Sequence, residues 1–303
     1  MVVIGGITRL THSGLSMVEW NPIIGSFPPM SDADWQVPFE KYKQSPEYQL
    51  INNQFTLEEF KSIYWWEYIH RMLGRTIGVV FLIPFIYFFI KKKFDKPLLK
   101  KMIVLLVLGA LQGVLGWFMV KSGLQKEPHV SHYRLAAHLI SAFTVFGFTF
   151  WYALDLLYPL TGEENKNKKL IRYTKIMFGF IVLQIIYGAF VAGLKAGSFY
   201  NTYPLMGKSF MPETVTAYET FWKNALENPA GVQFIHRWIA VVVAVLVLFV
   251  WEHARTIQLT SLQRKASNFM LAVVIVQFLL GVFTLIYAVP VAMGVLHQTG
   301  AFF

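Results

Sequence analysis

The chain has 303 residues, of which 55% are hydrophobic and 17% aromatic. Only 15% are charged, against roughly 25% in a typical soluble domain. It contains no cysteine, which excludes disulfide bonds, thiolate metal sites and cysteine nucleophiles. The formal net charge is +10, but the basic residues gather between apolar runs. We therefore interpret them as topology signals and expect no nucleic-acid partner.

Long apolar runs predict an all-α polytopic membrane protein, because about 20 apolar residues cross a hydrocarbon core roughly 30 Å thick. A first helix ends near Leu10 and an eighth begins near Val291. The six spans between them are predicted at 64–90, 102–121, 134–158, 171–195, 232–252 and 267–289. Only ten residues precede the first loop and about a dozen follow Pro290, so we expect the first and last helices to be incomplete in this chain.

Short basic connections set the predicted topology. The positive-inside rule places lysine-rich and arginine-rich loops on the cytoplasmic or matrix face. These inner loops are 91–101, 161–172, which includes Lys166, and 253–266. The long segments 11–61 and 196–231 then lie outside, and their prolines and aromatic residues predict ordered caps. We expect a multi-pass protein, surrounded by membrane lipid, in a bacterial cytoplasmic (inner) membrane or a mitochondrial inner membrane.

An internal duplication divides the chain. Ile69-His70-Arg71 recurs in the second half as Ile235-His236-Arg237, and Gln112…Gly116 recurs as Gln277…Gly281. The separation of His138 from His297 is nearly the same as the separation within these two matches. Several matches at nearly one offset indicate a repeat. We predict two pseudo-symmetric four-helix bundles, at residues 1–160 and 161–303.

Four of the eight histidines occupy repeat-equivalent places: His70 and His138 in the first half, His236 and His297 in the second. All four are predicted near the outer ends of their spans. Ionisable residues inside a membrane are costly and usually functional, and paired imidazoles from facing helices hold cofactor metals. Without cysteine, and with one carboxylate near these histidines, bis-imidazole heme is favoured over zinc or copper. The other four are interpreted as solvated or interfacial: His12, His129, His132 and His253.

Several arginines are predicted at the same outer face, where they could pair with heme propionates or anchor the interface. They are Arg9, Arg71, Arg75, Arg134 and Arg237. Glutamines four residues before glycines are interpreted mainly as close helix packing, or else as room for a flat macrocycle. These pairs are Gln112 with Gly116, Gln184 with Gly188 and Gln277 with Gly281.

The two halves differ at one polar position. Glu67 lies three residues before His70, whereas Gln233 lies three before His236. Residues at this spacing share a helix face. The first half is therefore predicted to carry out proton chemistry and the second to hold a cofactor only.

Several motifs resemble those of the heme A synthase family, and they occur in the same order along nearly the whole chain. They are Gly5-Gly6-Ile7-Thr8-Arg9, Glu67-x-x-His70-Arg71, Tyr133-Arg134-Leu135-Ala136-Ala137-His138, Tyr200-Asn201-x-Tyr203-Pro204, Gln233-Phe234-x-His236-Arg237 and His297-Gln298-x-Gly300. The chain is similar to the branch shared by mitochondria and many Gram-negative bacteria. The outer-loop cysteine pair of the other branch is missing.

The resemblance implies an oxidoreductase that converts the C8 methyl group of heme O to the formyl group of heme A. It implies heme b on His236 and His297, heme O on His70 and His138, and a catalytic acid at Glu67. Implied partners are heme O synthase, an electron donor or acceptor such as a ferredoxin or quinone, cytochrome oxidase assembly factors and a second copy in a homo-oligomer. A diheme b-type membrane electron carrier remains the alternative, and a transporter or scaffold with structural histidines is a third class.

Overall fold

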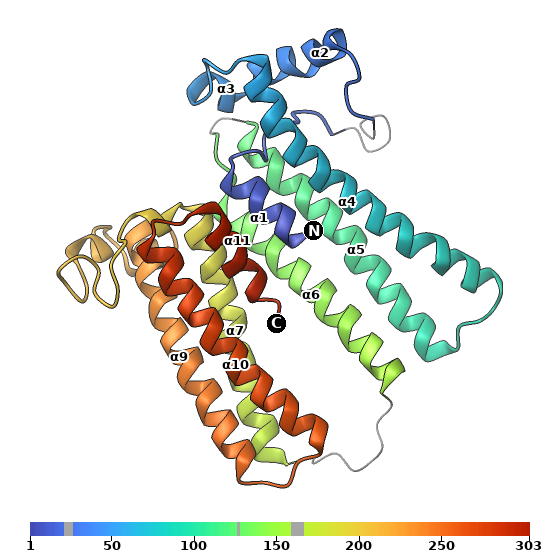
Figure 1. Cartoon of the computed structure of the whole chain (residues 1–303), viewed down its shortest axis with the longest axis vertical. Coiled ribbons are helices and arrows are strands. Elements are labelled where there is room, and N and C mark those ends of the chain that lie inside the picture. Colours follow the sequence, from blue (N-terminus) through green and yellow to red (C-terminus); the bar gives the residue numbers. More distant parts are fainter. Residues whose placement is uncertain (21–26, 126–127, 159–166) are drawn as a thin grey trace. The chain divides into compact units, whose positions relative to one another are not determined.

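The computed structural model describes residues 1–20, 27–125, 128–158 and 167–303. Within these ranges the chain forms α-helices and short 3-10 turns but no β-strand (Figure 1). The predicted all-α class is confirmed. Lys166 and the first half of the predicted inner loop 161–172, residues 161–166, lie outside the described residues.

Six helices in the described ranges are long and apolar enough to cross a membrane. They are α4 (Leu57–Ile90), α5 (Lys96–Gly123), α6 (His132–Leu157), α7 (Lys168–Gly193), α9 (Pro229–Arg255) and α10 (Ser261–Ile286). Two shorter helices, α1 (Val2–Leu10) and α11 (Val291–Gly300), stand at the positions predicted for the first and eighth spans. The prediction of a multi-pass membrane protein is confirmed.

The long helices turn apolar side chains outward. On α4, Ile77, Val80 and Ile83 recur every three residues and are 54%, 65% and 63% exposed. A soluble protein rarely exposes such a continuous apolar stripe. In a bilayer the stripe contacts lipid tails, while the helix satisfies its own backbone hydrogen bonds.

Two of the helices begin before the apolar runs that predicted them, and polar N-caps mark their first residues. The structure starts α4 at Leu57, well before the predicted start at 64, because Thr56 and Glu59 form a reciprocal capping box. Thr260 and Gln263 cap α10 in the same way, so that it begins at Ser261 rather than at 267. Hydropathy reports the apolar section of a helix, whereas polar caps decide where its hydrogen bonds begin.

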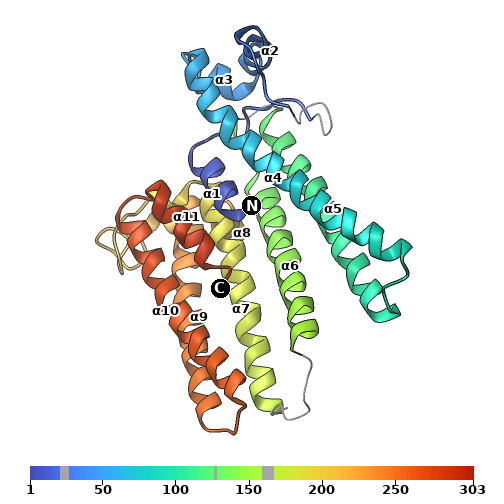
Figure 2. The same cartoon turned by 45° about the vertical axis from the view of Figure 1, so that its right-hand side comes forward.

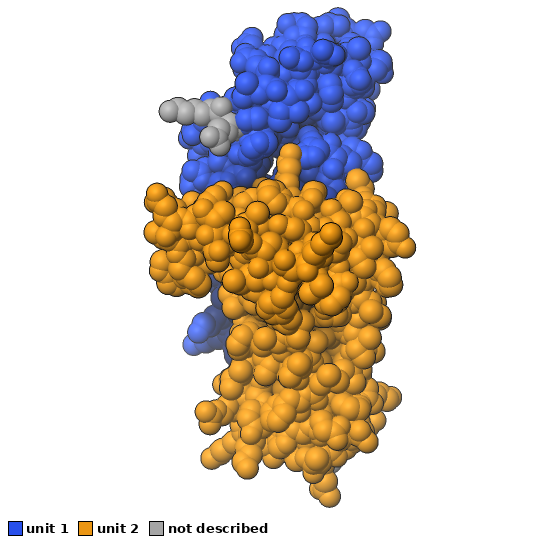
Figure 3. Space-filling model, turned by 90° about the vertical axis from the view of Figure 1, so that its left-hand side faces the viewer, with its two compact units in different colours: residues 1–152 blue, residues 153–303 orange. Residues whose placement is uncertain are grey.

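The chain divides into two compact units, Met1–Tyr152 and Ala153–Phe303 (Figure 3). The division falls within α6, and the boundary predicted between residues 160 and 161 lies outside the described residues. Unit 1 contains α1, α4, α5 and most of α6; unit 2 contains α7, α9, α10 and α11. In unit 1, α1 packs against α4; in unit 2, α9 packs against both α7 and α10, and α11 against α10.

An aromatic cap covers the N-terminal end of α4, as the composition of segment 11–61 predicts. Helices α2 (Asp32–Lys43) and α3 (Pro46–Leu50) lie beside the first turns of α4 (Figure 2). Trp35, Phe39 and Tyr42 of the cap are buried against α4. Burial and the nearby Glu47 carboxylate raise the pKa of Tyr42. This packing explains why α4 continues past the apolar span.

The segment between α7 and α9 of unit 2 is ordered by polar side chains. It contains η2 (Ala196–Ser198), η3 (Glu213–Thr216) and α8 (Phe221–Leu226). The buried Asn228 caps α9 and donates to the backbone oxygen of Thr214 at 2.7 Å. Asn224 donates to the backbone oxygen of Tyr218, also at 2.7 Å. These amides satisfy loop carbonyls that have no partner in regular structure.

Candidate functional site

In unit 1, both candidate histidines lie against a glycine of a neighbouring helix. A Cβ at Gly5 of α1 would approach the Nε2 atom of His70 to 3.1 Å. A Cβ at Gly116 of α5 would approach the Cε1 atom of His138 to the same distance. These separations are tighter than ordinary carbon contacts, so only glycine leaves the two imidazoles in place without a shift.

Unit 2 repeats this arrangement. A Cβ at Gly188 of α7 would lie 3.3 Å from the Cε1 atom of His236, and one at Gly281 of α10 would lie 2.8 Å from that of His297. In three of the four sites the Cε1 edge is closest to the glycine; His70 instead presents Nε2. The structure thus gives all four predicted histidines the same kind of neighbour.

The structure brings the histidines together in the predicted pairs. His138 has His70 as an electrostatic neighbour, and His236 has His297. Each pair comes from two different helices of one unit. Each pair is therefore internal to one unit, and paired imidazoles from two helices are an arrangement that can hold a cofactor.

The donor set fits a macrocycle-bound metal. In the described part of the chain, the Nδ1 atoms of His138, His236 and His297 are buried without a hydrogen-bond partner. Gln184 Nε2 lies 3.4 Å from His236 Nε2, so this ring nitrogen has a polar neighbour while the Nδ1 atom of the same ring has none. Among the described residues, no group of three or more His, Asp or Glu side chains is placed so that it could hold a metal ion by itself. Two imidazoles suffice for heme iron, because the porphyrin supplies the other nitrogen ligands.

Glu67 is buried, with 2% exposure, and fastens the loop that follows α1. Its Oε2 atom accepts hydrogen bonds from Ser16 Oγ at 2.7 Å and from the Met17 backbone N–H at 2.8 Å. Its Oε1 atom accepts one from Arg71 Nη2 at 2.6 Å. About three of the four acceptor positions of a carboxylate are thus used, and one on Oε1 remains.

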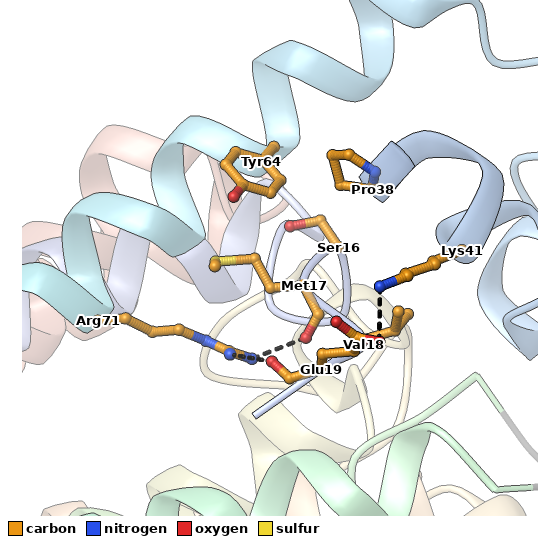
Figure 4. A pocket seen from close by; sticks show the side chains of 8 residues that line it. All are labelled: Ser16, Met17, Val18, Glu19, Pro38, Lys41, Tyr64 and Arg71. Atoms are coloured by element: carbon orange, nitrogen blue, oxygen red, sulfur yellow. Dashed lines mark hydrogen bonds and ion pairs between the residues drawn. The ribbon is translucent and has the colours of Figure 1, made fainter. Parts of the chain in front are cut away.

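Arg71 holds the same loop through backbone oxygens. Its Nη2 and Nη1 atoms donate to Met17 O at 2.9 Å and to Glu19 O at 3.0 Å. Together with Glu67 it forms what we call the loop clamp of unit 1. Figure 4 shows Arg71 reaching toward Met17 and Glu19 at the edge of a cavity of about 90 Å³. Ligand pockets have roughly 300–1,000 Å³, so this cavity is too small for a macrocycle.

Unit 2 contains an uncharged version of the loop clamp. Gln233 Nε2 donates to Tyr200 O at 3.1 Å. Arg237 Nη2 donates to the same oxygen at 2.7 Å, and its Nη1 donates to Thr202 O at 2.8 Å. The contacted backbone oxygens correspond in order. The separation in sequence from Met17 to Tyr200 equals that from Glu19 to Thr202. The repeat therefore preserves the contacts of the arginine with two backbone oxygens of the loop.

Other arginines predicted to bind a cofactor have varied surroundings. Arg134 Nη1 donates to Phe118 O at 2.9 Å, and its guanidinium lies 3.8 Å from the Phe118 ring centre. Arg75 Nη1 lies 3.4 Å from Met72 Sδ. Arg9 is on the last turn of α1. The contacts of Arg71, Arg134 and Arg237 agree with an anchoring role, and propionate binding by any of the five remains a prediction.

The remaining histidines lie apart from the two pairs. His12 and His129 are exposed, and the ring of His132 is tilted against that of Tyr133 with 4.0 Å between ring centres. His253 is in the last turn of α9, with its ring centre 5.3 Å from that of Tyr173.

Sequence reasoning did not identify Gly5 and Ser16 as parts of the sites. The sequence did contain an indication for Gly5, because it is the repeat equivalent of Gly188. Their separation in sequence equals that of Met17 and Tyr200. Ser16 had no such signal, since its contact with Glu67 depends on how the loop after α1 folds back.

The fold and the candidate site together define a multi-pass membrane protein with two repeated histidine pairs, one in each unit, and a loop clamp in each unit. Over residues 1–303 the chain matches the family model described as "Cytochrome oxidase assembly protein". Similar proteins carry the name heme A synthase. That of Flavobacterium johnsoniae is 50% identical and covers 100% of this chain and 90% of its own length.

That of Nitrosospira multiformis is 47% identical, over 99% of this chain and 85% of its own length. That of Ehrlichia canis is 44% identical, over 100% of this chain and 85% of its own length. No solved structure matches the chain. The chain belongs to the heme A synthase family. With bacterial relatives and six spanning helices, it is a multi-pass protein of the bacterial cytoplasmic membrane.

Proposed function

We propose that the chain is a heme A synthase, an oxidoreductase that converts the C8 methyl group of heme O to a formyl group. The substrate binds at His70 and His138 in unit 1, and a resident heme b binds at His236 and His297 in unit 2. The conversion replaces two hydrogens of the methyl carbon by one oxygen atom and is a four-electron oxidation. Written with water, the methyl group and one H2O give the formyl group, four protons and four electrons, and the electrons pass to the quinone or other electron partner. Heme b, when bound, supplies one-electron redox chemistry.

One observation carries the assignment of roles to the units. Both contain a glycine-packed histidine pair and a loop clamp, but the clamp of unit 1 is acidic at Glu67 and that of unit 2 is neutral at Gln233. A positioned carboxylate can act as a general base, whereas a glutamine amide cannot. Of the two repeated sites, only that of unit 1 therefore has a group at this position that can move protons. We therefore place the reaction in unit 1.

The residues of unit 1 have distinct tasks. His70 and His138 hold the substrate iron and so fix the position of the macrocycle. Glu67 lies one turn before His70 on α4 and keeps one acceptor position on Oε1, where it can take a proton during oxidation of the substrate carbon. The loop clamp keeps Ser16 and Met17 over this carboxylate and limits access of water to it.

The proposed activity requires partners. A heme O synthase supplies the substrate, and assembly factors of cytochrome oxidase take the product. A ferredoxin or a quinone exchanges electrons with the enzyme, and membrane lipid surrounds it. A homo-oligomer is also expected.

Chromatography of hemes extracted from the purified protein tests the proposal. Produced in cells that make heme O, the protein should yield heme B together with heme O, a hydroxylated form or heme A. A diheme electron carrier would yield heme B alone, and that result would overturn the proposal. A protein without any heme absorbance would instead indicate a transporter or scaffold.

A further inference from the structure

Two glutamines hold the backbones of two candidate histidines from a neighbouring helix. Gln277 Nε2 of α10 donates to the backbone oxygen of His297 at 2.8 Å. Gln112 Nε2 of α5 donates to that of His138 at 3.2 Å. A helix carbonyl has two lone pairs, so it can accept this bond besides any bond within its own helix.

Each glutamine acts together with the glycine one turn further on. Residues four apart lie on one helix face, and Gly281 and Gly116 are the glycines that face the rings of His297 and His138. We call each pair a glutamine–glycine clasp. The glutamine fixes the depth and rotation of the histidine's backbone, and the glycine admits its ring. Together they restrict the imidazole more than either contact alone.

The clasps differ at one repeat-equivalent position. In unit 1, Ser141 Oγ donates to Gln112 Oε1. The equivalent residue in unit 2, at the offset that relates His138 to His297, is Gly300. Gln277 Oε1 lies against Gly300 and is buried with no hydrogen-bond partner among the described residues. The first clasp is therefore closed by a hydroxyl, and the second is open.

We propose that the two clasps orient His138 and His297 toward iron, and that Ser141 locks the first clasp so that His138 is held before a substrate heme arrives. The inference rests on the proposed function, in which heme b resides in unit 2 and heme O enters unit 1. A resident heme holds its own axial histidine through the iron bond. A site that a substrate enters and leaves lacks that constraint for part of each cycle, so a protein contact must supply it.

Gln277→Met tests the open clasp. Methionine has a similar length but no N–H donor. His297 remains, so heme b still binds, but its low-spin electron paramagnetic resonance signal should shift and its loss during detergent purification should increase on the order of 10-fold. Val276→Met is the matched control, since Val276 is the preceding residue on α10 and is 56% exposed. A resonance signal and heme content identical to those of the control would overturn the role of the clasp.

Ser141→Ala tests the lock. Removing the hydroxyl leaves Gln112 Oε1 without its donor, as in unit 2. Heme O affinity in a titration should weaken about two- to tenfold, the usual effect of one hydrogen bond. The heme b spectrum of unit 2 should not change, and it reports that the variant is folded. Thr149→Val removes a hydroxyl two turns further along α6 and serves as control.

The outcomes distinguish the two claims. Equal heme O affinity in Ser141→Ala and Thr149→Val overturns the lock while leaving the proposed function intact. A wild-type protein that binds heme b but not heme O overturns the proposed function of unit 1 and the lock with it, while the Gln277→Met comparison still decides the clasp of unit 2. A wild-type protein that binds neither heme overturns both.

Discussion

Replacing Glu67 by glutamine tests whether this carboxylate takes part in the reaction or only fastens a loop. The amide oxygen can still accept from Ser16 Oγ and from the Met17 N–H, which now bond to Oε2. The amide nitrogen cannot accept the bond that Arg71 donates to Oε1 at 2.6 Å. The variant therefore loses the charge and one contact, and unit 1 comes to resemble unit 2, which has Gln233 at this position.

The expected cost in stability is moderate. Removing one partner of a buried ion pair costs about 3–5 kcal/mol when the other charge is left unpaired. Here the side chains of Arg71 and Glu67 are 10% and 3% exposed, but Arg71 keeps its bonds to Met17 O and Glu19 O. The loss should therefore approach that of one hydrogen bond to a charged group, about 1.5–3 kcal/mol. We expect a folded protein.

The assay measures heme A formation and the heme b spectrum on the same preparation. If Glu67 is a general base, heme A output should fall by about 10²-fold or more while the heme b spectrum stays unchanged. Ser16→Ala is the matched control, because it removes one bond of the loop clamp and keeps the carboxylate.

Two results would refute this reasoning. Near-normal heme A output from Glu67→Gln would remove the carboxylate from the mechanism. An equal loss of output in Ser16→Ala and Glu67→Gln would show that the loop clamp matters and the acid itself does not.

Three further predictions concern the two units and the membrane topology. His236→Leu should abolish the stable low-spin b-type absorption spectrum, because a buried iron loses one axial ligand, whereas His70→Leu should keep most of it and stop heme A formation. Gly281→Ala should lower heme b content, because the new methyl group would come within 2.8 Å of the His297 ring. Such overpacking typically destabilises the folded state by about 1–3 kcal/mol. A cysteine introduced at Lys208 should react with an impermeant thiol reagent from outside, and one at Lys93 only from inside.

Contrary results would be specific. Loss of the b-type spectrum in His70→Leu with retention in His236→Leu would invert the assignment of the units. Gly113→Ala is the control for Gly281→Ala, because a Cβ at Gly113 has no neighbour within 4 Å; an equal effect of both would exclude crowding of the ring. Reaction of the cysteine at position 93 from outside would reverse the topology.

The amino-acid sequence by itself determined the class of the protein and the four histidines. Lipid-facing helices need long apolar runs whatever their neighbours, so the positions of the six spans follow from hydropathy. The duplicated Ile-His-Arg triplet and the spacing of His138 and His297 mark equivalent residues without any coordinates. The helix ends were less predictable, as the start of α4 at Leu57 shows. Capping side chains and the packing of the aromatic cap add helical turns outside the apolar section.

Only the tertiary structure decided what those residues contact. Arg71 and Arg237 bind backbone oxygens of distant loops, and every residue type offers such an oxygen, so no sequence pattern marks the partner. The glutamines at 112 and 277 likewise reach histidine carbonyls on another helix. Periodicity along one helix reports which face is apolar, but the pairing of polar groups between helices depends on how the helices pack.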